Sequence, residues 1–169
     1  VSALLLGLAL ASCATRANYL HPLGPRYAGD HAPAAAVEPG APRTLRAVSY
    51  NLRYGEDVDG AIGLFARDEL EEADLVVLQE VCAAGVDRIA RALGHRYVYY
   101  PASLRSSGRD FGNAVLTRGR LLADEKVLLP CANPFNRQRR IAVRTRIALD
   151  GRELDVYSVN TETPFMGLE

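Results

Sequence analysis

The sequence lacks a net charge, a hydrophobic run long enough to cross a membrane, and internal repeats. It holds 20 basic and 20 acidic residues among 169, so no overall field draws it toward nucleic acid, which argues against a dedicated DNA-coating protein. Its longest apolar run, residues 1–11, is shorter than a bilayer-spanning helix. The length leaves room for one folded domain with a leader or tail.

Cysteine and glycine-rich loops are also scarce. Of the three cysteines, Cys82 and Cys131 do not have the spacing of a zinc site. They could form a disulfide in an oxidising compartment or remain two buried thiols. No glycine-rich phosphate loop follows any expected strand, which argues against a nucleotide-binding α/β domain.

The first residues are typical of an export signal. The uncharged run of residues 1–11 fits the apolar region of a secretory signal. The following Leu10-Ala11-Ser12-Cys13 resembles the lipobox of bacterial lipoproteins. This resemblance implies that Cys13 is acylated and becomes the mature N-terminus, which would anchor the protein in the bacterial cell envelope, in the periplasm or at the cell surface. The alternative is an ordinary cleaved signal in which Cys13 has no role.

Residues 14–43 are predicted to be a disordered tether. The stretch 28–42 (AGDHAPAAAVEPGAP) is mostly Ala, Pro and Gly without hydrophobic periodicity, as in extended linkers. The folded domain is therefore expected over residues 44–169.

That region alternates between strand-like and helix-like patterns. Its last two strands should form a hairpin, because Asp150-Gly151 suits a two-residue type I′ turn. The order of the elements predicts mixed sheets with helical covers. Strands are expected at Thr44–Leu52, Asp74–Glu80, Arg96–Tyr100, Asn113–Thr117, Leu121–Leu129, Arg140–Leu149 and Leu154–Val159, and helices at Ala61–Ala73 and Ala84–Leu93 with Gly94 as a stop.

Polar residues at strand ends are the best candidates for chemistry. Glu80 closes an apolar strand that would hold its carboxylate still, and Mg²⁺ often takes only one or two carboxylates. Asn51 could support that carboxylate or contact phosphate, and Asn160 could stabilise a phosphoryl oxygen. Each has a simpler alternative: Glu80 could cap the sheet or the next helix, and both asparagines could form turns.

Arg140 is a further candidate because a guanidinium matches phosphate in shape and charge. It precedes Arg144 and Arg146 on one face of a strand. The alternative is therefore that all three belong to an ordinary solvated face.

Taken together, the motifs resemble the endonuclease/exonuclease/phosphatase superfamily. The resemblance rests on residues 74–81 (DLVVLQEV), 99–102 (YYPA), 112–117 (GNAVLT), 139–143 (RRIAV) and 151–163 (GRELDVYSVNTET). It implies an α/β (α+β) four-layer sandwich, in which two mixed sheets pack face to face with helices outside. It also implies metal binding by Glu80 and Asn51, phosphate contacts by Asn51 and Asn113, and catalytic roles for Arg140 and Asn160. Asn160 stands where many members have His.

The implied activity is hydrolysis of phosphodiester or phosphomonoester bonds with Mg²⁺ or Mn²⁺. The substrate could be a lipid headgroup, a nucleic acid or a small molecule, and the protein is expected to be a monomer. The resemblance covers the N-terminal half of such a domain, so the chain is expected to be a fragment that is inactive alone. A non-catalytic lipoprotein that uses the same fold for binding or as a scaffold is the alternative.

Overall fold

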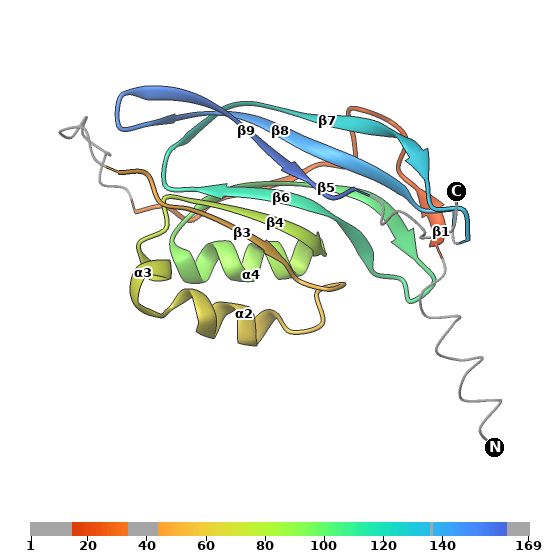
Figure 1. Ribbon diagram of the computed structural model, residues 1–169, viewed down its shortest axis with the longest axis horizontal. Helices are drawn as coiled ribbons and strands as arrows, with labels where there is room; N and C mark the ends of the chain where they lie inside the picture. Colours follow the sequence, from red (N-terminus) through yellow and green to blue (C-terminus); the bar gives the residue numbers. More distant parts are fainter. Residues whose placement is uncertain (1–14, 34–43, 136, 162–169) are drawn as a thin grey trace, which may run out of the picture.

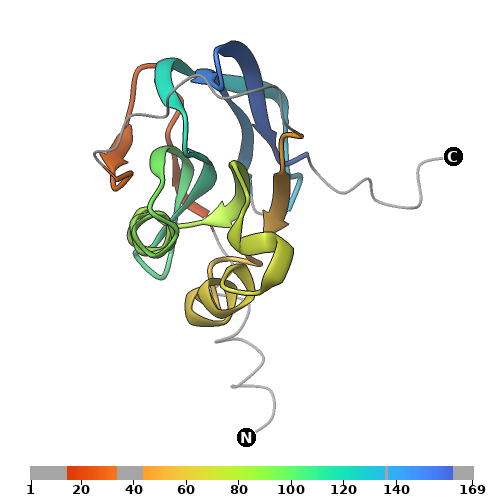
Figure 2. The same ribbon diagram turned by 90° about the vertical axis from the view of Figure 1, so that its left-hand side faces the viewer.

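The computed structural model describes residues 15–33, 44–135 and 137–161, and within them two β-sheets pack face to face. Figure 1 shows the helices against one sheet, and that sheet against the second. Seen end-on in Figure 2, the helices and β7–β9 lie on opposite sides of the central sheet. The expected α/β sandwich is confirmed, and the described residues form three of its layers. No helix among the described residues is long and apolar enough to cross a membrane.

The central sheet contains the predicted buried strand. Its strands run in the order β1-β5-β6-β4-β3, and β2 also pairs with β5. Only β3 and β4 are parallel among these pairs, with Asn51 opposite Gln79. The strands are β1 (Thr15–Asn18), β2 (Tyr27–Asp30), β3 (Ala47–Asn51), β4 (Leu75–Val81), β5 (Arg96–Arg105) and β6 (Asp110–Thr117).

The second sheet is an antiparallel meander of β7 (Arg120–Ala132), β8 (Arg139–Leu149) and β9 (Arg152–Val159). The predicted turn between β8 and β9 is confirmed, because Asp150 and Gly151 both have positive φ, 49° and 72°. The chain crosses between the sheets at Gly119. A Cβ there would lie 2.5 Å from the carbonyl oxygen of Ala148, so the close crossing requires glycine.

The helices are α2 (Val58–Phe65), α3 (Asp68–Glu71) and α4 (Ala83–Leu93). The prediction for α4 is confirmed, including its end at Gly94. The single helix expected over residues 61–73 is wrong, because Arg67 has an extended backbone (φ −107°, ψ 128°) between α2 and α3. The helix also begins earlier than predicted, since the side chain of Asp57 accepts a hydrogen bond from Gly60 N at 2.7 Å.

Two hydrophobic cores hold the layers together. One lies between the helices and the central sheet and includes Phe65, Leu78 and Ile89. The other lies between the two sheets and includes Val115 and Ile147. From β8, Ile141, Val143 and Ile147 face the inter-sheet core, because alternate side chains of a strand point to one face of the sheet.

The prediction that residues 14–43 form a disordered tether is wrong for residues 15–33, which we call the N-terminal arm. The arm runs along β5 through β1 and β2. It also contacts the second sheet: Lys126 Nζ donates to the carbonyl oxygens of Tyr19 (2.9 Å) and Gly24 (2.6 Å). Arg26 binds Asp124 through Nε and Nη2 at 2.6 and 2.7 Å. These long-range contacts order a segment that has no periodicity of its own. Cys13 and residues 34–43 lie outside the described residues.

Candidate functional site

Three of the predicted site residues come from strands that end at the same end of the sandwich, which we call the site end. Asn51 is the last residue of β3, Glu80 is the second-to-last residue of β4, and Asn160 directly follows β9. Since β3 and β4 are parallel, their carboxyl ends meet there. The site end is at the right of Figure 1, where β9 points.

Glu80 projects from an irregularity in its strand. The pairing of β4 with β6 is regular up to Gln79, opposite Asn113, and resumes with Val81 opposite Gly112, which leaves Glu80 as the extra residue of a β-bulge. Glu80 has φ +57°, a region that non-glycine residues seldom adopt. Bulges redirect side chains and are frequent beside active sites. Here the bulge leaves Glu80 half-buried at the end of the strand.

Glu80 and Asn160 are in direct contact across the two sheets. Asn160 Nδ2 donates a hydrogen bond to Glu80 Oε1 at 3.2 Å. Both side chains are half-buried, so they remain reachable from solvent. The structure therefore joins two residues that are 80 positions apart in the sequence.

Asn51 begins a tight loop beside them. Its Oδ1 accepts a hydrogen bond from Arg53 N at 2.8 Å, so the turn-forming alternative is present, while the side chain itself remains exposed. Arg53, Tyr54 and Gly55 then have consecutive positive φ values of 45°, 65° and 63°. Strained backbone of this kind persists where the surroundings fix it, and it clusters at functional sites.

The loop is fixed against Glu80 through Gly55. A Cβ at Gly55 would lie 3.9 Å from the carbonyl oxygen of Glu80. Arg109 Nη2 donates to the carbonyl oxygen of Gly55 at 3.0 Å and contacts Cys82 Sγ at 3.5 Å. Cys82 is a buried free thiol, which is one of the two alternatives left open by the sequence.

A polar network lies in the interior just behind the site end. Gln79 Nε2 is 3.3 Å from Ser49 Oγ and 3.4 Å from Ser158 Oγ, and Ser158 Oγ donates to the carbonyl oxygen of Leu78 at 3.0 Å. The network links β3, β4 and β9 inside the protein. It fixes the strand that carries Glu80 relative to the strand that precedes Asn160.

Asn113 belongs to this interior network. The resemblance implied either a structural role or a place at the edge of the site for Asn113, and its 2% exposure agrees with the structural role rather than with a phosphate contact. Its Nδ2 donates to the carbonyl oxygens of Ile141 (2.9 Å) and Ser158 (3.2 Å). The amide thus connects β6 to both β8 and β9, since a buried amide group must satisfy its hydrogen-bonding capacity.

Arg140 also differs from the expected solvated face. It is 9% exposed, and its guanidinium carbon lies 5.3 Å from the centre of the Phe111 ring. Phe111 packs on Tyr54 at 5.5 Å between ring centres, and Arg105 lies 4.1 Å from the centre of the Tyr54 ring. This cation–aromatic stack could not be predicted from the sequence, because its members come from distant segments.

The entry to β8 is fixed by the N-terminal arm. Asn18 Nδ2 donates to the carbonyl oxygen of Arg137 at 2.9 Å, and Asn18 Oδ1 accepts from Arg139 N at 2.8 Å. Gln138 Nε2 donates to Ser103 Oγ at 2.8 Å in the interior. These bonds position the backbone immediately before Arg140. The sequence analysis missed Asn18 because it assigned the arm to a tether.

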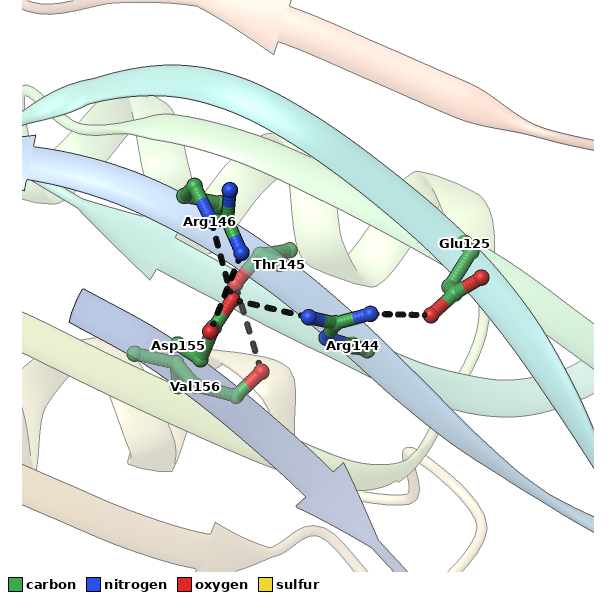
Figure 3. Close-up of polar contacts among 6 residues, drawn as sticks. All are labelled: Glu125, Arg144, Thr145, Arg146, Asp155 and Val156. Atoms are coloured by element: carbon green, nitrogen blue, oxygen red, sulfur yellow. Dashed lines mark hydrogen bonds and ion pairs between the residues drawn. The ribbon is translucent and has the colours of Figure 1, made fainter. Parts of the chain in front are cut away.

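Arg144 and Arg146, in contrast, do lie on a solvated face. Figure 3 shows Arg144 between Glu125 and Asp155, and Arg146 beside Asp155. Arg144 contacts Glu125 at 2.8 Å and Asp155 at 3.3 Å, and Arg146 contacts Asp155 at 3.3 Å. The Arg146 guanidinium lowers the pKa of Asp155, with Arg144 contributing. A pocket of about 210 Å³ lies between these side chains, whose charges are already paired with one another.

The donors at the site end suit a hard cation with few protein ligands. The described residues contain no cluster of three or more His, Cys, Asp or Glu side chains, so a metal there would depend on Glu80 and on amide oxygens. Mg²⁺ prefers oxygen ligands and usually keeps several waters beside one or two carboxylates. The oxygens of Glu80 and Asn51 therefore fit Mg²⁺ better than Zn²⁺, which takes Cys and His.

Comparison with known proteins identifies the fold. No family profile and no curated protein matches the chain. Among solved structures, it resembles an endonuclease/exonuclease/phosphatase family protein from Leptotrichia buccalis C-1013-b, with a TM-score of 0.56 and 15% identity over 73% of this chain and 57% of that one.

Two further structures have similar scores, each over 73% of this chain. One is D. rerio TDP2 complexed with single-strand DNA product (TM-score 0.53, 17% identity, 48% of that chain). The other is a β-hairpin deletion mutant of beta toxin from Staphylococcus aureus (TM-score 0.52, 15% identity, 53% of that chain).

The chain has the endonuclease/exonuclease/phosphatase fold. It spans about half the length of the solved structures that it resembles. The predicted fold resemblance is thereby confirmed.

Proposed function

We propose that the protein is a hydrolase of phosphodiester or phosphomonoester bonds that depends on Mg²⁺ or Mn²⁺. The observation that carries the proposal is the hydrogen bond between Asn160 Nδ2 and Glu80 Oε1. It unites a carboxylate on a bulge with an amide from the other sheet, at the end where Asn51 also lies. The fold shared with a named endonuclease/exonuclease/phosphatase family protein supports the same conclusion.

The residues have distinct roles in this proposal. Glu80 and Asn51 would hold the cation, which polarises phosphoryl oxygens and stabilises negative charge on a leaving oxygen. Asn160 orients the Glu80 carboxylate, and its amide can donate to a substrate oxygen where charge increases. Arg140 provides a fixed positive charge close to the site end, because its guanidinium is held over Phe111.

We further propose that the protein is anchored in the bacterial cell envelope through acylated Cys13 and acts as a monomer. The substrate would be a phosphate ester of a lipid, a nucleic acid or a small molecule. The non-catalytic alternative, a binding or scaffold lipoprotein, is favoured by the neutral amide at position 160.

Metal binding separates the two functions without depending on turnover. Mn²⁺ can be titrated into the protein and into a Glu80→Gln variant while the free ion is followed by electron paramagnetic resonance. We expect binding to the unaltered protein and a loss of at least tenfold in affinity for the variant, because the substitution replaces the charged Glu80 ligand by a neutral amide. The Glu153→Gln variant is the matched control, since Glu153 is exposed on the β8–β9 hairpin at the opposite end.

Hydrolysis of a chromogenic phosphodiester, with Mg²⁺ and with chelator, is the second measurement. Chelator-sensitive turnover that disappears in Glu80→Gln supports the hydrolase. Mn²⁺ affinity that is the same in Glu80→Gln as in the unaltered protein would refute the metal site. Metal binding without turnover, when measured on the complete protein, would favour the binding module.

A further inference from the structure

The N-terminal arm enters the fold at the site end. β1 pairs antiparallel with β5, with Thr15 opposite Arg105, the last residue of β5. The chain turns there into β6, whose Gly112 lies opposite both Pro101 and Val81, so the bulge at Glu80 is level with Pro101, four residues before Arg105. Only one residue separates Cys13 from Thr15, and two peptide steps span at most about 7 Å. An acyl chain on Cys13 would therefore hold the site end, rather than another part of the domain, near a membrane.

The site end is rich in arginine although the whole chain has no net charge. Arg16, Arg53, Arg109 and Arg137 are exposed there, and Arg105 and Arg139 are half-buried. The acidic groups at this end include Glu56, Glu80 and Asp110, and Asp110 accepts a hydrogen bond from Ala83 N at 3.0 Å. Among the described residues, positive charge thus predominates at this end of the sandwich, as required to attract an anionic surface.

An exposed aromatic ring projects from the same surface. Phe135 is 75% exposed in the β7–β8 connection. Its backbone is ordered, because Phe135 N donates to Asn133 Oδ1 at 2.9 Å, and Asn18 binds the residues that follow it. A large apolar ring flanked by arginines suits the boundary between lipid headgroups and acyl chains, where apolar area and positive charge both contribute to binding.

We propose that the site end is a membrane-docking surface that binds anionic phospholipid. Phe135 enters the headgroup region, Arg16 and Arg137 contact lipid phosphates, and the half-buried Glu80 faces the bilayer. It follows that the substrate is the phosphate ester of a membrane lipid; this consequence rests on the proposed hydrolase function, whereas the docking itself does not.

Single-stranded nucleic acid could also bind arginines and an aromatic ring. A membrane is favoured because the predicted anchor at Cys13 enters at this same end.

Vesicle binding tests the surface separately from the anchor. The full chain carrying Cys13→Ser is mixed with vesicles of equal parts phosphatidylglycerol and phosphatidylcholine, or of phosphatidylcholine alone, and the bound fraction is measured by flotation. We expect binding to the anionic vesicles that weakens with added salt. Arg16→Glu and Arg137→Glu should each lower the partition coefficient at least about 5-fold, and Phe135→Ala about tenfold.

Matched controls lie away from the site end. Arg152→Glu alters an exposed arginine on the β8–β9 hairpin, and Leu122→Ala removes a side chain that is 42% exposed near the start of β7. Neither should change the partition coefficient by more than twofold. Circular dichroism melting curves, expected to coincide for all variants, separate a lost surface from a lost fold.

Equal vesicle binding by the site-end variants and the controls would overturn the proposal. The proposal would also be overturned if Arg16→Glu and Phe135→Ala bound a single-stranded oligonucleotide less well while their vesicle binding stayed intact. That result would assign the surface to nucleic acid. Turnover of a soluble chromogenic phosphodiester by the same variants is the readout for the hydrolase, and it should be unchanged, so the two proposals fail independently.

Discussion

Replacing Asn113 by alanine should destabilise the protein because its amide joins three strands across the interior. Asn113→Ala removes two hydrogen bonds, at 2.9 and 3.2 Å, from a side chain that is 2% exposed. Each contributes about 1 kcal/mol to the free energy of unfolding. The volume left behind adds about 1 kcal/mol. The total expected loss is therefore about 2–4 kcal/mol.

Urea denaturation followed by circular dichroism measures this loss. With a slope of about 2 kcal/mol per molar urea, the midpoint should fall by roughly 1–2 M. Asn160→Ala is the matched control: it also removes an amide that bridges the two sheets, but one that makes a single 3.2 Å bond in a half-buried position. Its cost should stay below about 1 kcal/mol. If Asn113→Ala costs no more than Asn160→Ala, the assignment of Asn113 as the inter-sheet connection is wrong.

Two further predictions concern pH. His95 is fully buried, and burial lowers its pKa below the ordinary 6.5. As the pH falls below 6.5, the unfolded chain therefore binds a proton at His95 before the folded protein does, and the free energy of unfolding should decline by up to about 1.4 kcal/mol per pH unit. Denaturation series at successive pH values should show a smaller slope for His95→Gln. An unchanged slope would contradict the role of His95. The Arg26 guanidinium lowers the pKa of Asp124, so the attachment of the arm is complete above pH 3.8 and is lost as the pH falls through the lower folded value. Asp124→Asn removes that ion pair at neutral pH and should speed tryptic cleavage after Arg26 about 5-fold, a modest effect because the partly exposed Arg26 is screened by solvent. Equal cleavage rates in the two proteins would show that the ion pair does not hold the arm.

Elements with a strong local signal could be predicted from the sequence. The apolar run ending in Gln79-Glu80 predicted β4, because a strand buried on both faces must be apolar throughout. α4 and the hairpin at Asp150-Gly151 followed in the same way from a helical periodicity and a turn dipeptide. In each case the residues that determine the element lie inside it.

The N-terminal arm could not be predicted, because the interactions that order it come from far along the chain. β1 and β2 are four residues each and gain their partners from β5. The ion pair of Arg26 with Asp124 spans 98 positions. The alanine- and proline-rich residues that follow led to the prediction of a tether, whereas the order of residues 15–33 depends on tertiary contacts.

The candidate site was predictable in part for the same reason. Polar residues at strand ends identified Glu80, Asn51 and Asn160, since strand ends converge at one end of a sheet. The bulge that redirects Glu80 left no trace in the sequence, because it depends on the register with β6. The burial of Asn113, likewise, depends on how the second sheet covers it.

The arm has a practical consequence for anyone who produces the domain. A version trimmed to begin at Arg43, as the composition suggests, would lose β1 and β2 and leave the ten residues of β5 as an unprotected outer strand. It would also strip the carbonyl partners from the Lys126 ammonium, which is only 4% exposed. Open strands of that length recruit other chains, so such a version should precipitate during purification, whereas one that retains residues 15–33 should stay in solution.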